Sequence, residues 1–232
     1  MRPIGLIGGM SWESSAEYYR LINEDMRARL GGMHSAACVL YSFDFAEVEA
    51  LQRAGDWERA GGLLADAAGA LERAGAGLLV LCTNTMHRLA PEVEAAAEIP
   101  LVHIADPTAE AALAAETETV GLVGTRYTME GEFYRRRLEE RHGLRVLIPD
   151  EPDRSAIHEI IYDELVVGQL REESRRRYAI AIEDLIGRGA QAIILGCTEI
   201  GLLVGPEDAS VPILDTTILH ARAAVTLALE MS

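Results

Sequence analysis

The sequence predicts an α/β fold of two pseudo-symmetric, doubly wound lobes, each with a four-stranded parallel sheet flanked by helices. Short apolar runs alternate with longer helical patterns, as expected for parallel strands joined by crossover helices. The chain also repeats itself at about half of its 232 residues. Residues 4–8 resemble residues 120–124, and the run that ends at Cys82 resembles the run that ends at Cys197. A chain of two like halves is expected to fold as two like lobes.

We expect four strands in each half of the chain, because buried parallel strands read as short, nearly continuous apolar runs. The runs are 3–7, 36–43, 77–82 and 100–104 in the first half, and 119–123, 144–148, 191–196 and 211–214 in the second. The repeat places an N-terminal lobe at 1–104 and a C-terminal lobe at 105–214. We expect a last helix within 215–232 to pack back on the N-terminal lobe.

Helical patterns fill the stretches between these strands. The first is expected to begin near Ser14 or Ser15 and to end at Gly31, with Tyr19, Ile22, Met26 and Leu30 on one face. The others cover 56–73, 128–141, 155–167, 171–187 and 216–230. Glycines follow several of these segments, as is common at helix ends.

The composition excludes several classes of protein. All 21 basic residues are arginine. Without a lysine the chain cannot hold pyridoxal phosphate as a Schiff base or form a P-loop. The formal net charge of −16 disfavours binding to nucleic acid and to anionic membrane surfaces.

The cysteine count and the N-terminal residues lead us to expect a cytoplasmic protein. Three cysteines in a chain of this length do not make a disulfide framework. The first three residues lead directly into a predicted strand, so we expect no signal peptide. No apolar run approaches the roughly 20 residues that span a bilayer. We therefore expect a cytoplasmic protein, where thiols stay reduced.

Cys82 and Cys197 are the strongest candidates for chemistry. Each lies where a predicted strand gives way to a turn and a helix, and ligands of open parallel sheets bind at these carboxyl ends. The N-terminus of a helix lowers the pKa of a thiol and holds a carboxylate. Polar neighbours add hydrogen-bond donors at both places: Thr83, Asn84, Thr85 and Thr198. Each half therefore supplies a potential base and part of an anion cradle, and the two would meet in a cleft between the lobes.

A structural reading of the cysteines is also possible, since a cysteine often ends a buried strand as a small apolar side chain. Two cysteines at equivalent positions, each followed by threonine, favour the chemical reading instead. Cys38 has no polar neighbours and no counterpart in the other half, so we expect it to belong to the core.

The glycine-rich segment at residues 5–11 lacks the G-x-G-x-x-G spacing of a dinucleotide loop. We interpret it as a tight strand-to-helix turn that brings backbone N–H groups to the site. Its counterpart in the second half is Gly124 and Thr125, and both turns are expected beside the cysteine turns.

Four motifs in order closely resemble the aspartate/glutamate racemase family, and most of all its broad-specificity amino-acid racemase branch. They are residues 8–14 (GGMSWES), 82–87 (CTNTMH), 124–128 (GTRYT) and 196–200 (GCTEI). The resemblance implies two doubly wound lobes with the site between them, usually in a homodimer. It also implies racemisation of amino acids without pyridoxal phosphate or any other cofactor or metal. One cysteine thiolate removes the α-proton, and the other thiol returns a proton from the opposite face.

The resemblance also implies roles for individual residues. Cys82 and Cys197 become the acid–base pair. Contacts to the substrate, chiefly to its α-carboxylate, fall on Met10, Ser11, Thr83, Asn84, Thr85, Thr125 and Thr198, with weaker carry-over to Gln52 and Glu199. Glu199 is expected to hold the substrate ammonium, to adjust Cys197 or to act as a structural cap. His87 is expected to order the cysteine turn rather than to transfer protons.

The sequence departs from dedicated aspartate racemases in the pocket for the substrate side chain. Those enzymes use basic residues there, one of which falls in the stretch 160–167, where this chain has valine. Another comes from the region of residues 42–45, which has no arginine, although Arg53 is near in sequence. The substrates are therefore expected to be aspartate, glutamate or a broader set that includes uncharged amino acids.

Three alternatives remain open. Cys82 and Arg88 have the C-x5-R spacing of cysteine phosphatases, but the loop lacks their glycines and Cys197 is left unexplained. The same scaffold hosts cis–trans isomerases and decarboxylases of small diacids. A non-catalytic amino-acid-binding protein needs the pocket but not the two thiols.

Overall fold

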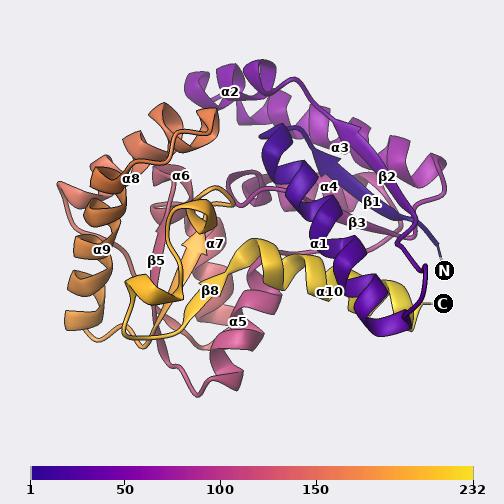
Figure 1. Ribbon diagram of the computed structural model, residues 1–232. Coiled ribbons are helices and arrows are strands. Elements are labelled where there is room, and N and C mark those ends of the chain that lie inside the picture. Colours follow the sequence, from indigo (N-terminus) through magenta and orange to yellow (C-terminus); the bar gives the residue numbers. More distant parts are fainter. Residues whose placement is uncertain (1, 232) are drawn as a thin grey trace. The chain divides into compact units, whose positions relative to one another are not determined.

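The computed structural model describes residues 2–231, which form two compact units. The first unit comprises the chain as far as His103 together with the part from His220 onward, and the second runs from Ile104 to Leu219. Each unit contains one four-stranded parallel sheet flanked by helices (Figure 1). The predicted fold class is therefore confirmed, with all eight predicted strands present.

The first sheet has the strand order β2-β1-β3-β4, and all its neighbours are parallel. Its strands are β1 (Ile4–Gly8), β2 (Cys38–Ser42), β3 (Leu78–Leu81) and β4 (Leu101–Val102). β1 and β3 are buried throughout and lie side by side, with Ile7 opposite Leu81. The turns that follow these two strands therefore lie next to each other.

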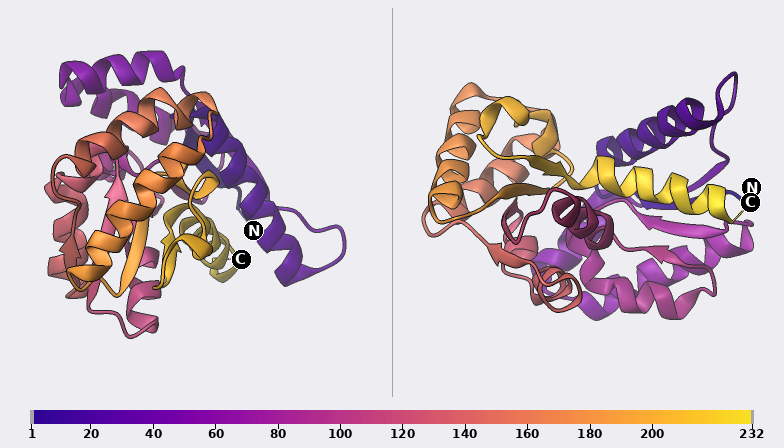
Figure 2. Two further views of the ribbon diagram at one scale, coloured as in Figure 1. Left: turned by 60° about the vertical axis from the view of Figure 1, so that its left-hand side comes forward. Right: turned by 90° about the horizontal axis from the view of Figure 1, so that it is seen from below.

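Helices cover both faces of the first sheet. They are α1 (Trp12–Leu30), α2 (Phe45–Ala54), α3 (Trp57–Arg73), η1 (Thr85–Leu89), α4 (Ala90–Ala96) and the larger part of α10 (Thr216–Glu230). Successive residues of a strand point to opposite faces. Ile4 and Leu6 accordingly pack with residues of α1 and α10, while Ile7 packs with residues of α3. The ribbon views show α1 and α10 on one side of this sheet and α3 on the other (Figure 2). The first unit thus has two apolar layers, one on each side of its sheet.

The second sheet repeats this arrangement with the order β6-β5-β7-β8. Its strands are β5 (Thr119–Gly124), β6 (Arg145–Leu147), β7 (Ala192–Gly196) and β8 (Ile213–Asp215). One face packs against α5 (Ala105–Ala114), α7 (Glu132–Arg136) and η2 (Arg137–Arg141). The other packs against α8 (Asp153–Asp163), η3 (Leu165–Val167) and α9 (Glu172–Gly187). Three short helices complete the unit: α6 (Arg126–Met129), η4 (Ile200–Leu202) and η5 (Pro206–Asp208).

Two helix predictions need correction. α1 begins at Trp12 rather than at Ser14 or Ser15, and its buried face carries Tyr18, whereas Tyr19 is 55% exposed and Leu30 is also exposed. The predicted helix 128–141 is divided into α6, α7 and η2. The division falls at Gly131, which has an extended conformation and packs so closely on the Tyr127 carbonyl that a Cβ would collide with it.

Three α-helices had no counterpart in the prediction, namely α2 and α4 of the first unit and α5 of the second. Among residues 2–231, every helix is too short or too polar to cross a lipid bilayer.

Candidate functional site

The turn after β1 is built around a glycine. Gly9 has φ +85°, and a Cβ on it would collide with the backbone of Phe43. Its N–H donates to the Ser15 hydroxyl at 2.7 Å. Ser11 then caps α1, because its Oγ accepts the N–H of Ser14 at 3.2 Å. This tight turn places Met10 and Ser11, both buried, at the carboxyl end of β1.

The turn after β3 lies directly against the turn after β1. The N–H of Cys82 donates to the Ile7 carbonyl at 2.9 Å, and the Cys82 carbonyl accepts the Ser14 hydroxyl at 3.1 Å. The next three residues are also buried, namely Thr83, Asn84 and Thr85. Thr85 is the first residue of η1. The structure therefore brings the predicted residues of both turns together.

The Cys82 side chain is fully buried in an apolar layer. It lies on the same sheet face as Leu78 and Val80, under α1 and α10, and its thiol is 3.7 Å from the Val80 carbonyl. Burial raises the pKa of the Cys82 thiol well above its usual range. The expectation of a lowered pKa is therefore wrong. The helix that follows is a single 3-10 segment, and removal of the thiol from water outweighs its N-terminal field.

Two further residues reach the Cys82 turn. Gln52, buried on α2, donates from Nε2 to the Met86 sulfur at 2.9 Å. His87 donates from Nδ1 to the Thr83 carbonyl at 2.7 Å. Arg53, by contrast, is exposed and forms an ion pair with Glu49 at 2.6 Å on the surface of α2. It therefore does not supply the cation that the sequence lacks near residues 42–45.

Cys38 lies apart from these turns. It opens β2, is partly buried and packs against the same apolar layer as Cys82. Burial raises the pKa of its thiol to about 11. Its surroundings agree with the expected role in the core.

In the second unit, the ends of β5 and β7 are brought close by glycine. Gly124 and Gly196 are register partners, and a Cβ on Gly124 would lie 2.8 Å from the Gly196 carbonyl oxygen. Thr125 follows β5, is buried and caps α6 by accepting the Thr128 N–H at 3.2 Å. Cys197 follows β7. The two predicted residues thus leave adjacent strands at the same end of the sheet.

Cys197 is paired with a carboxylate. Its thiol donates to Glu199 Oε2 at 2.9 Å, and the Thr198 hydroxyl donates to the same oxygen at 2.7 Å. Glu199 is only 5% exposed. Burial raises the pKa of the Cys197 thiol well above its usual range, and the charge of Glu199 raises it further. Here too the expected lowering is wrong, but the thiol has a partner that is able to accept its proton.

Tyr178 of α9 was not predicted as a site residue. It is fully buried in the apolar layer against which Cys197 packs. Among the described residues its hydroxyl has no hydrogen-bond partner. Burial raises the pKa of Tyr178, and the ionisable groups of Cys197 and Glu199 raise it further. Tyr178 resembles any other core residue of an amphipathic helix in the sequence, and only the structure reveals its polar surroundings.

The valines of the stretch 160–167 differ in their surroundings. Val166 packs against the apolar layer of α8 and α9, whereas Val167 is 60% exposed. Neither supplies a positive charge.

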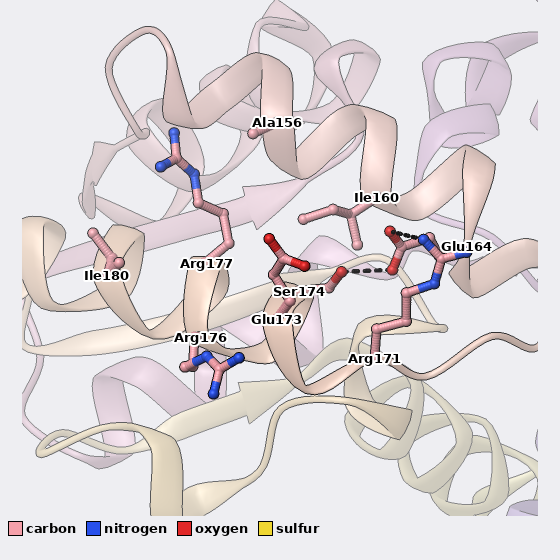
Figure 3. A pocket seen from close by; sticks show the side chains of 9 residues that line it. All are labelled: Ala156, Ile160, Glu164, Arg171, Glu173, Ser174, Arg176, Arg177 and Ile180. Carbon is pink, nitrogen blue, oxygen red and sulfur yellow. Dashed lines mark hydrogen bonds and ion pairs between the residues drawn. The ribbon is translucent and has the colours of Figure 1, made fainter.

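A groove of about 570 Å³ lies between α8 and α9 of the second unit (Figure 3). It is lined by Ala156, Ile160, Glu164, Arg171, Glu173, Ser174, Arg176, Arg177 and Ile180. Glu164 accepts hydrogen bonds from Ser174 at 2.5 Å and from Arg171 at 3.3 Å. The groove is built from helices rather than from the strand ends that carry the predicted residues. Across residues 2–231, no group of three or more His, Cys, Asp and Glu side chains is arranged to hold a metal ion.

Comparison with known proteins links the chain to one family. Residues 7–224 match the family model described as Asp/Glu/Hydantoin racemase. A Yersinia pestis protein assigned as an Asp/Glu racemase is 54% identical, with a TM-score of 0.93 over 99% of this chain and 100% of the other. An aspartate racemase homologue from Pyrococcus horikoshii is 33% identical, with a TM-score of 0.85 over 99% of this chain and 100% of the other.

More distant structures share the fold alone. One is the glutamate racemase of Francisella tularensis, solved in complex with D-glutamate, which is 16% identical and has a TM-score of 0.66. The match covers 99% of this chain and 82% of that one.

Proposed function

The chain belongs to the Asp/Glu/Hydantoin racemase family, and we propose that it interconverts L- and D-amino acids by proton transfer between Cys82, Cys197 and the substrate α-carbon, without a cofactor. One observation carries the proposal. Each cysteine follows the strand that pairs with the first strand of its own unit, and each is followed by a threonine. The repeat thus supplies two equivalent thiols.

In the proposed reaction, one sulfur takes the α-proton as a thiolate, and the other delivers its proton to the opposite face of the carbanion. One S–H bond forms and one breaks, so the enzyme ends with the protonation states of its two thiols exchanged. The resting state favours one direction for the first turnover. Cys82, a buried thiol, acts as the proton donor in this direction, whereas Cys197, whose thiol donates to Glu199 at rest, becomes the base by passing its proton to that carboxylate.

The substrate carboxylate and the carbanion need hydrogen-bond donors in a site that excludes water. We propose that buried residues at the strand ends supply them, and that Gln52 and Met10 complete the pocket. The donors are Ser11, Thr83, Asn84, Thr85, Thr125 and Thr198. Arg53 is paired with Glu49, and residues 166 and 167 are valine. We therefore propose that these positions supply no positive charge to bind a carboxylate on the substrate side chain. Uncharged amino acids are therefore proposed as substrates beside aspartate and glutamate.

We also propose that the protein works as a homodimer in the cytoplasm. Four exposed large apolar side chains support a self-association surface on α1 and on β2, the edge strand of the first sheet: Trp12, Tyr19, Leu40 and Tyr41. Exposed apolar side chains at a sheet edge are typical of protein contacts. Light scattering coupled to size-exclusion chromatography checks the mass.

The test is exchange of the α-proton in D2O, with a panel of L- and D-amino acids and no added cofactor. Wild-type protein is expected to exchange and to racemise. Cys82→Ser and Cys197→Ser are each expected to lower racemisation by about 10²–10⁴-fold, as for loss of a general acid or base. Cys38→Ser is the matched control and should retain activity. Near-normal kcat in either of the first two variants contradicts the two-thiol mechanism.

The same experiment separates the alternatives. The buried, protonated state of Cys82 is also compatible with a protein that only binds amino acids. Tight binding without α-proton exchange would identify that function. Conversion of an unsaturated diacid without exchange at an amino-acid α-carbon would identify a diacid isomerase.

A further inference from the structure

Three buried histidines gather in the first unit, next to the Cys82 turn. They are His87 of η1, His103, which follows β4, and His220 of α10, with exposed fractions of 1%, 5% and 0%. The ring centroid of His87 is 4.6 Å from that of His103 and 5.6 Å from that of His220, both edge to face. Such a cluster is costly to bury unless its polar atoms are paired.

Hydrogen bonds define the state of two of these rings. Since a carbonyl oxygen only accepts, His220 donates from Nε2 to the Val102 carbonyl at 2.7 Å. Its Nδ1 then accepts the Tyr18 hydroxyl at 2.8 Å. By the same reasoning, Nδ1 of His87 carries the proton that is donated to the Thr83 carbonyl at 2.7 Å.

The cluster occupies a special place along the chain. His103 is the last residue of the first unit before the chain enters the second, and His220 is the first residue after it returns. His87 contacts both rings and also holds the carbonyl of the residue that follows Cys82. His87 therefore connects the Cys82 turn to His103, where the chain leaves the first unit, and to His220, where it returns.

Two successive carbonyls of the turn are therefore held by side chains. Ser14 of α1 donates to the Cys82 carbonyl, and His87 donates to the Thr83 carbonyl. A buried thiol that transfers a proton must be placed within a fraction of an ångström, because a misplacement of about 1 Å can cost 100-fold in rate. The N–H of Cys82 makes the last backbone hydrogen bond from this segment to β1, and the turn beyond it has local backbone hydrogen bonds, from the Thr83 N–H to the Leu81 carbonyl at 2.8 Å and from the His87 N–H to the Asn84 carbonyl at 3.1 Å. The side-chain hydrogen bonds of Ser14 and His87 add to these local bonds.

We propose that His87 is a positioning residue for Cys82, whose Nδ1–H, backed by the rings of His103 and His220, fixes the turn that presents the thiol. The inference rests on the proposed function for the role of Cys82 in proton transfer. The position of the turn itself does not depend on that role and is measured separately.

The test compares two substitutions in the full-length protein. His87→Asn keeps a donor close to the position of Nδ1 but loses the ring, whereas His87→Phe keeps a ring but loses the donor. We expect His87→Phe to lower kcat by about 10- to 100-fold. His87→Asn should restore most of the activity. His34→Asn, on an exposed loop, is the matched control.

The second readout is alkylation by iodoacetamide, followed for each cysteine by mass spectrometry. His87→Phe and Ser14→Ala should each change the rate at Cys82 several-fold relative to Cys197 in the same molecule, and His87→Asn should not. Equal losses of activity in the Asn and Phe variants, or unchanged alkylation of Cys82 in both His87→Phe and Ser14→Ala, would overturn the proposal. If the wild-type protein does not racemise amino acids, the proposed function fails, and the alkylation rates still decide the role of His87.

Discussion

The thiol of Cys197 donates a 2.9 Å hydrogen bond to the carboxylate of Glu199, a residue two positions along the chain that is itself almost completely buried. Burial and the negative charge of Glu199 both raise the pKa of Cys197. The same carboxylate that disfavours a thiolate is thus the group placed to take its proton. The pair is testable, because removal of the Glu199 charge should make the Cys197 thiol more reactive and racemisation slower.

Glu199→Gln removes the charge with little change in size. The pKa of Cys197 is then expected to fall, so that its alkylation by iodoacetamide at pH 8 becomes faster, while racemisation falls by about 10²-fold or more because the proton acceptor is lost. Glu199→Asp keeps the charge and is the control, with slow alkylation as in the wild type. Slower or unchanged alkylation in Glu199→Gln would contradict the assigned interaction.

Gly9→Ala should be among the most damaging small substitutions in the first unit. The residue has φ +85°, and a Cβ would meet the backbone of Phe43. Strain and overpacking together are expected to cost roughly 2–5 kcal/mol of the free energy of unfolding. Gly32→Ala is the matched control, since Gly32 also has a positive φ, +58°, but open space around it. A cost of about 1–2 kcal/mol is expected there. Urea unfolding measures both, and equal costs would show that the contact with Phe43 is unimportant.

Much of the fold was predictable because buried parallel strands leave a simple pattern. β1, β3, β5 and β7 are continuous apolar runs that end in glycine or cysteine, and each was found within one residue or so. The helix faces were less certain. Tyr18 and Tyr19 are adjacent and equally apolar, and only the packing under α10 decides that Tyr18 faces inward. The break at Gly131 depends on its contact with Tyr127, which no local periodicity records.

The sequence predicted where the candidate residues lie in the fold, but not their electrostatics. Turn glycines and threonines mark the strand ends in the sequence, and the structure places Cys82 and Cys197 there. The direction of the thiol pKa shifts depends on how deeply each thiol is buried and on Glu199, which are properties of the folded chain. The contact of His87 with His103 and His220 joins segments far apart in the sequence, so it could not be read from any single motif.

The buried hydroxyl of Tyr178 provides a stability prediction. It has no hydrogen-bond partner among residues 2–231, so Tyr178→Phe removes a desolvated polar group and should leave the free energy of unfolding unchanged or raise it by about 1 kcal/mol. Tyr18→Phe is the matched comparison, because the equally buried Tyr18 hydroxyl donates to His220 at 2.8 Å. That variant should lose about 1–3 kcal/mol. Thermal and urea unfolding compare the pair, and a large loss in Tyr178→Phe would indicate an unrecognised partner.

The histidine cluster predicts how stability depends on pH. The pKa of His87 is lowered by burial and by the neighbouring rings of His103 and His220, so the folded protein keeps this ring neutral. In the unfolded chain a histidine titrates near pH 6.5, so below that pH the unfolded state binds the extra proton. The contribution of His87 is therefore fully present above about pH 6.5 and is lost as the pH falls, by up to about 1.4 kcal/mol per pH unit.

His87→Asn isolates this effect, because it removes the titrating ring and retains the donor to Thr83. Burial also lowers the pKa of His158, so the wild-type slope contains a second contribution that the variant leaves in place. Urea unfolding between pH 7.5 and 5 should therefore show a shallower loss of stability for His87→Asn than for the wild type, with the exposed His34→Asn unchanged. Parallel curves for the wild type and His87→Asn would mean that the His87 ring is protonated as readily in the folded protein as in the unfolded chain, which is incompatible with its burial between two other histidines.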